Sequence, residues 1–154
     1  MNKKYILTEE YKNIIVSDNQ SKRVFRIMAI RSFGGVKAGQ LGGFVEKEEN
    51  LSHEDDCFVF DDAVVCDDAR VEKNSLVMDN ALIFGNALLT DNAIVVDNAI
   101  LKDRVVVRGD SEITDSDQKQ LQNSGFLHHL LWLHFLKPMQ SLKPEHFQRL
   151  LHCP

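Results

Sequence analysis

The sequence contains no run of about 18 apolar residues, so we expect no membrane-spanning helix. Its first residues include lysines but no long apolar segment, so a signal peptide is not expected either. Cysteine is scarce: Cys57, Cys66 and Cys153 are odd in number and form no CxxC pair. These features predict reduced thiols in a cytoplasmic protein without a disulfide framework.

Positive charge is scarce in the middle of the chain. Residues 41–114 carry six Lys and Arg against seventeen Asp and Glu, whereas residues 1–40 carry eight against three. An acidic middle argues against a nucleic-acid groove, which needs clustered positive charge. The basic N-terminal region is interpreted as solvated surface that complements the acidic part, with contact to an anionic partner as the alternative.

One hexad repeats along this acidic middle. Its third place is mostly small and its fifth place is aliphatic, and these two places share one face of a strand. Its first two places hold mostly Asp, Asn or Gly, which accept turn conformations. Each hexad is therefore predicted to form a short strand and a corner, with successive coils stacked about 4.8 Å apart. The ten hexads of residues 55–114 are DDCFVF, DDAVVC, DDARVE, KNSLVM, DNALIF, GNALLT, DNAIVV, DNAILK, DRVVVR and GDSEIT.

The repeated V-x-D-N-A-x pattern resembles the hexapeptide repeat of the left-handed parallel β-helix, the fold of trimeric acyltransferases and γ-class carbonic anhydrases. The resemblance implies that three hexads form one triangular coil. The expected fold is therefore mainly β, a left-handed parallel β-helix of about three coils with an N-terminal β-hairpin cap and C-terminal helices. One place departs from the pattern: it is often Gly in enzymes of that superfamily, and here it holds residues such as Phe60, Glu72 and Phe84.

A narrower resemblance covers the segment before the repeat. Residues 26–60 are similar to the lead-in of small uncharacterised bacterial and prophage hexapeptide-repeat proteins. In those proteins the motif V-K-A-G-D-L-G-G begins the coil, and residues 36–43 read VKAGQLGG here. This narrower family implies no activity.

We expect three parts: a hairpin and lead-in cap in residues 1–43, the β-helix in residues 44–114 and a helical tail in residues 115–154. Two β-branched runs around the turn signal DNQS predict the hairpin, which would cover the open end of the coils. A partner-binding arm is the alternative for the hairpin. Asp115 or Ser116 is expected to cap the first helical turn of the tail. The tail is expected to pack on protein through Phe126, Leu130, Leu131, Trp132 and Phe135.

Enzymes of the superfamily use histidine as a general base or a metal ligand, and the ten hexads contain none. We therefore expect no metal site and no cofactor. The acidic residues Asp56, Asp62 and Asp68 fall on consecutive corners of a triangular coil, so we interpret them as turn formers.

His53, just before the hexads, is the one catalytic candidate near the coils. The favoured interpretation is a loop histidine that hydrogen-bonds the backbone where the chain enters the first coil. The alternative is a general base oriented by Glu54, Asp55 or Asp56.

Places four and six of each hexad are expected to face outward and to form three sides. Two sides are apolar and must be covered. We expect the tail to cover one and a second copy of the chain to cover the first side, as a trimer or, second, as a dimer. The first side comprises Phe58, Phe60, Leu76, Met78, Ile94 and Val96; the second comprises Val64, Cys66, Leu82, Phe84, Ile100 and Lys102; the third, which is mixed and more soluble, comprises Arg70, Glu72, Leu88, Thr90, Val106 and Arg108.

These observations favour a non-catalytic, self-associating binding or scaffold protein of bacterial or prophage origin, with a protein partner and with neither nucleic acid nor membrane as a partner. A prophage origin would agree with an inhibitor of a host or defence protein. The alternative is an acyl-CoA-dependent, acyltransferase-like enzyme that uses His53.

Overall fold

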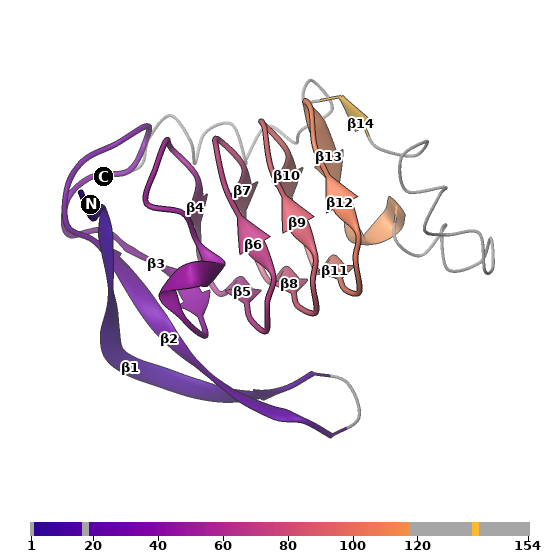
Figure 1. Ribbon diagram of the computed structural model, residues 1–154, viewed down its shortest axis with the longest axis horizontal. Helices are drawn as coiled ribbons and strands as arrows, with labels where there is room; N and C mark the ends of the chain where they lie inside the picture. The colour runs from indigo at the N-terminus through magenta and orange to yellow at the C-terminus, as the bar shows by residue number, and fades with distance from the viewer. Residues whose placement is uncertain (1, 17–18, 118–136, 139–154) are drawn as a thin grey trace.

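A computed structural model of the chain describes residues 2–16, 19–117 and 137–138. The antiparallel hairpin of β1 (Tyr5–Ile15) and β2 (Ser21–Ala29) leads through β3 (Leu41–Val45) into a rod of short parallel strands (Figure 1). A short 3-10 helix, η1 (Glu48–Asn50), precedes the first hexad.

The rod has three sides, and each side is a sheet with one parallel strand per coil. The first side consists of β4, β7, β10 and β13, the second of β3, β5, β8 and β11, and the third of β6, β9 and β12. The strands are β4 (Phe58–Val59), β5 (Val64–Val65), β6 (Arg70–Val71), β7 (Leu76–Val77), β8 (Leu82–Ile83), β9 (Leu88–Leu89), β10 (Ile94–Val95), β11 (Ile100–Leu101), β12 (Val106–Val107) and β13 (Ser111–Ile113).

The mainly β fold class and the stacked parallel coils are confirmed. The rod has about four coils where about three were expected. The difference arises before the first hexad, because β3 pairs in parallel with β5 and Leu51 forms a parallel bridge to Val71. The lead-in segment therefore supplies rungs of the second and third sides.

The third and fifth places of the hexads fill the interior. Ala63, Ala81 and Ala93 have no exposed surface, and neither do Val77 and Ile83. Small residues near the corners leave room for the aliphatic residues at the centre, which gives the close packing that a narrow interior requires. The inward register predicted from the repeat is confirmed.

The corners lie at the first place of each hexad. Asp61, Asp79 and Asp97 have φ of 59°, 60° and 61°, the left-handed region that Asp tolerates. The Asp61 carboxylate accepts the Asp79 backbone N–H at 3.1 Å, and that of Asp79 accepts the Asp97 N–H at 3.0 Å. Each carboxylate thus joins one coil to the next, so these acidic residues form turns and link coils.

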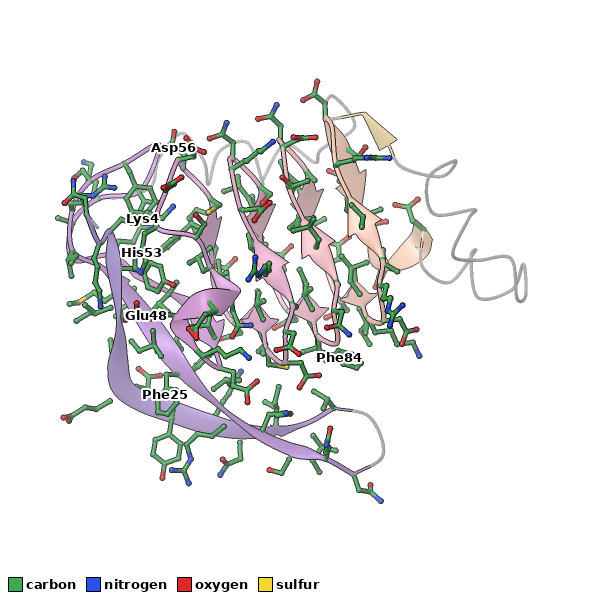
Figure 2. All side chains as sticks on the ribbon, in the orientation of Figure 1. Lys4, Phe25, Glu48, His53, Asp56 and Phe84 are labelled. Atoms are coloured by element: carbon green, nitrogen blue, oxygen red, sulfur yellow. The ribbon has the colours of Figure 1, made fainter. Side chains whose placement is uncertain are left out.

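The hairpin does more than close the end of the rod. Its proximal part supplies Tyr5 and Ile27 to the main core, where they cover the first coil. Its distal part lies along the second side, where Val24 packs in a cluster with Cys66 and Phe84, and Phe84 points from the coil toward the hairpin (Figure 2). The second side therefore has its apolar cover within the same chain along β5 and β8, whereas Ile100 of β11 is exposed.

Glycines in the lead-in allow the close approach of β3 to the coils. A Cβ atom on Gly42 would lie 2.5 Å from the carbonyl oxygen of Val59, and one on Gly43 would lie 2.5 Å from that of Ala63. Backbone atoms cannot give way as flexible side chains do, so both positions require glycine. This explains the Gly-Gly pair of the VKAGQLGG motif.

The last coil ends in a capping arrangement. The Asp117 carboxylate accepts hydrogen bonds from the Thr114 backbone N–H and hydroxyl, both at 3.0 Å, as residues 115–117 begin a helix. The expected caps, Asp115 and Ser116, are wrong by one or two positions, because Thr114 is the residue that pairs with a carboxylate three positions later. The strand β14 (Lys137–Pro138) pairs antiparallel with β13.

The expected packing residues of the tail, Phe126, Leu130, Leu131, Trp132 and Phe135, lie outside the described residues. Within the described ranges, no helix has the length and apolar character needed to cross a membrane.

Candidate functional site

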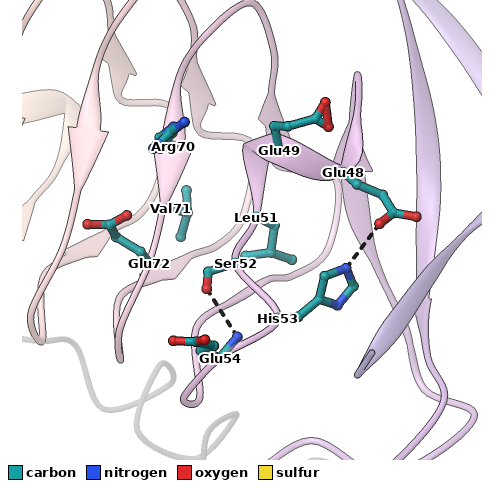
Figure 3. A pocket seen from close by; sticks show the side chains of 9 residues that line it. All are labelled: Glu48, Glu49, Leu51, Ser52, His53, Glu54, Arg70, Val71 and Glu72. Carbon is teal, nitrogen blue, oxygen red and sulfur yellow. Dashed lines mark hydrogen bonds and ion pairs between the residues drawn. The ribbon is translucent and has the colours of Figure 1, made fainter. Parts of the chain in front are cut away.

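A pocket of about 360 Å³ opens between η1, the segment that follows it, and the third side (Figure 3). Leu51 and Val71 form its floor, and charged or polar side chains surround them. The carboxylates are those of Glu48, Glu49, Glu54 and Glu72, and Arg70, Ser52 and His53 complete the lining.

His53 lies between the hairpin and η1, with only 8% of its surface exposed. Its Nδ1 atom accepts the backbone N–H of Lys4 at 3.2 Å, so the proton of the neutral ring is assigned to Nε2. Nε2 lies 3.2 Å from Glu48 Oε2, and the ring stacks on Tyr5 with centroids 4.2 Å apart. Through Nδ1 the ring therefore holds the backbone just before β1, and through Nε2 it contacts η1, in agreement with the favoured interpretation of a loop histidine.

Glu48 is held on two sides. Lys3 Nζ lies 2.9 Å from one carboxylate oxygen and His53 lies against the other. The hydrogen bond from Lys3 is the main cause that lowers the pKa of Glu48, and the bond to His53 adds to it. Glu48 therefore stays ionised and orients the His53 ring. The neighbours Glu54, Asp55 and Asp56 were expected to orient His53 in the catalytic alternative. Within the described part of the chain, the ring is hydrogen-bonded to Lys4 and Glu48 and not to these three residues.

A buried lysine lies beside this pocket (Figure 2). Lys4 has no exposed surface, and its ammonium donates to the carbonyl oxygens of Cys57 at 2.7 Å, Asp55 at 3.0 Å and Glu54 at 3.3 Å. It also lies 4.5 Å from the centre of the Phe33 ring. Burial lowers the pKa of Lys4, while the carbonyl cage and the aromatic face stabilise its charge.

Lys4 was not singled out from the sequence, where it is one of two adjacent lysines near the N-terminus. Only the pairing of β1 with β2, and the contact of both with the first coil, places it over the carbonyls of residues 54–57. No periodic signal in the sequence could have identified it.

The two cysteines of the coils are buried thiols. Burial raises the pKa of Cys66 to about 12, with nearby Asp67 and Glu46 acting in the same direction. Burial also raises the pKa of Cys57, against the opposing effect of Lys4. Neither thiol therefore forms the reactive thiolate that nucleophilic catalysis requires.

The expected interface residues of the first side are covered in the single chain. Phe58, Phe60, Met78, Ile94 and Val96 are buried, and Leu76 is half-buried. Phe33 packs edge-on against Phe58 at 5.5 Å, and Phe58 does the same against Phe60 at 5.1 Å. In the single chain these side chains are therefore not an open surface for a second copy.

The third side is the open one. The strands β9 and β12 face the viewer in Figure 1 with no other described element in front of them. Arg70, Val106 and Arg108 are exposed, Glu72 and Leu88 are half-buried, and Thr90 is buried. The mixed, solvent-facing character predicted for this side agrees with the structure at every position except Thr90.

No group of three or more His, Cys, Asp or Glu side chains within the described ranges is arranged to hold a metal ion. No protein-family model and no curated protein matches the sequence. The fold, the pocket and the open third side are therefore the observations from which a function can be argued.

Proposed function

We propose that this protein is a non-catalytic, self-associating binding or scaffold protein. The observation that carries the proposal is the rod itself: its first side is buried, its second side is covered by the hairpin over two coils, and its third side is open. A rigid rod with one flat, open side suits contact with another macromolecule better than the enclosure of a small substrate.

The engagement of His53 supports a non-catalytic role. A general base needs a lone pair that can reach the substrate proton. In this structure the lone pair of Nδ1 accepts the Lys4 N–H, and Nε2 lies against Glu48. The ring would have to leave the hairpin before it could act on a substrate.

The origin and target of the protein follow from the resemblance alone. The ten hexads and the VKAGQLGG lead-in support membership of the hexapeptide-repeat proteins, with a bacterial or prophage origin. A prophage product of this kind would act as an inhibitor of a host or defence protein, in the cytoplasm. Affinity capture from bacterial lysate, repeated with a competing excess of untagged protein, would test this: the proposal requires a protein partner that the excess displaces.

Self-association is tested by sedimentation velocity over a wide range of protein concentration. A sedimentation coefficient that rises with concentration supports the proposal. A monomer throughout would contradict the self-associating part of it. Hydrogen exchange tests whether the first side takes part in an assembly. If it does, the backbone amides of β4, β7 and β10 should exchange at rates that depend on protein concentration.

The alternative is an acyl-CoA-dependent, acyltransferase-like enzyme, favoured by the position of His53 beside a pocket of about 360 Å³. The pocket's four carboxylates disfavour it, because they would repel the phosphates of coenzyme A. Calorimetric titration with acetyl-CoA, and with coenzyme A as the control, distinguishes the two functions. Saturable binding of acetyl-CoA would favour the enzyme.

A further inference from the structure

The outward side chains of the third side form two columns along the rod. Parallel pairing aligns Arg70 with Leu88 and Leu88 with Val106. The second column, two positions further along each strand, contains Glu72, Thr90 and Arg108. Glu72 and Arg108 are two rungs apart, which separates them by about 10 Å along the rod.

The charged members of these columns lie outside the ion pairs that the described residues form. None of the ion pairs among the described residues includes Arg70, Glu72 or Arg108. By contrast, the corner residues Asp67 and Asp68 beside this side pair with Lys22 and Lys47. The open side therefore presents charge of both signs around the apolar side chains of its centre, and in the described part of the chain this charge is not used in an ion pair.

The charge of the second column is polarised. Its N-terminal end carries Glu72, close to the pocket carboxylates Glu49 and Glu54, while Arg70 occupies the same rung of the first column. Its C-terminal end carries the exposed Arg108. A column that is acidic at one end and basic at the other is complementary to itself when turned end for end.

We propose that the third side is a self-association surface, on which a second copy of the chain docks face to face and antiparallel. This proposal rests on the proposed self-association and names the surface and symmetry for it. The two-fold axis lies along β9, between the two faces, so that β6 of one copy meets β12 of the other.

This arrangement matches the two columns. Each column meets its own counterpart in reverse order, so Glu72 lies opposite Arg108 of the other copy, twice per dimer. Leu88 lies opposite Leu88, and the aliphatic stem of Arg70 lies over Val106, which is 37% exposed in the single chain. The third side is small, so the dimer is weak and transient, and its ion pairs make it sensitive to salt.

The test is a charge-swap series measured by sedimentation equilibrium at low ionic strength. Glu72→Arg places two like-charge pairs in the dimer, and Arg108→Glu does the same with the opposite sign. Each single variant is expected to raise the dimer dissociation constant about tenfold or more. Glu9→Arg is the matched control, because it makes the same charge change at an exposed position on the hairpin.

A compensating charge change distinguishes loss of the interface from unfolding of a variant. An equimolar mixture of Glu72→Arg and Arg108→Glu, and also the double variant, pairs opposite charges again and is expected to recover association. If the wild type associates and neither charge reversal weakens the association, the third side is not the interface, although the protein does self-associate. A trimer would overturn the two-fold arrangement, and a wild-type monomer at every concentration would overturn both proposals.

Discussion

Lys4 tests whether the polar contacts at the N-terminal end hold the rod together. Lys4→Met keeps an unbranched apolar stem but removes the ammonium that donates to three carbonyl oxygens at 2.7 to 3.3 Å. Each buried acceptor left without a donor costs about 1–3 kcal/mol of stability. Removal of the buried charge offsets part of this cost, because the ammonium no longer has to be desolvated. We expect a net loss of about 2–4 kcal/mol in the free energy of unfolding.

The assay is urea denaturation followed by far-ultraviolet circular dichroism, with Lys37→Met as the control. Lys37 is exposed in the lead-in loop, so its substitution should change stability by no more than about 0.5 kcal/mol. If Lys4→Met is as stable as the wild type or more so, the desolvation of the ammonium outweighs its hydrogen bonds. The reasoning about the carbonyl cage would then be refuted.

The pH dependence of the same variant gives a second test. Because the pKa of Lys4 is lowered in the folded protein from its ordinary value of 10.5, the unfolded chain binds more protons between the two values. Stability of the wild type relative to Lys4→Met should therefore rise as pH rises through that window. A relative stability that falls over this range would show that the folded protein binds the Lys4 proton more tightly than the unfolded chain does.

Further predictions concern the coils. Val77→Asp places an unpaired charge in the interior and should unfold the rod, whereas Asp79→Asn keeps a corner acceptor and should cost about 0.5 kcal/mol or less; thermal denaturation compares them. Gly43→Ala should lower the melting temperature markedly, because its Cβ would lie 2.5 Å from a backbone oxygen, and equal stability would contradict the close approach. Cys66, with its pKa raised to about 12, should react with a thiol reagent at neutral pH only after urea is added.

Features that repeat every six residues could be predicted from the sequence. Side chains alternate between the two faces of a strand, so Val77 and the residue two places before it share the inward face. This alternation can be recognised from a few neighbouring residues. The left-handed corner at Asp79 follows in the same way, because Asp tolerates a conformation that the hexad needs once per side. Because the same local pattern recurs in ten hexads, it can be recognised in the sequence.

Contacts between non-repeating segments could not be predicted. The sequence identified His53 and an apolar first side, but gave no sign that Lys4 would occupy the histidine's Nδ1 lone pair. Nor did it indicate that the hairpin, expected at the end of the rod, would also lie along the second side. The two strands of a hairpin pair with each other whichever surface they cover. The local sequence pattern therefore does not predict which side of the rod the hairpin covers.

The sequence by itself determined the parallel coil, its inward residues and its corners. The tertiary structure decided which sides of the rod are filled and which one stays open. The physical reason is that inward burial is set by neighbours a few residues apart, whereas a side such as the second is covered by a segment far away in the chain. Arg70, Glu72 and Arg108 are ordinary charged residues in the sequence, and only the fold aligns them on the open side.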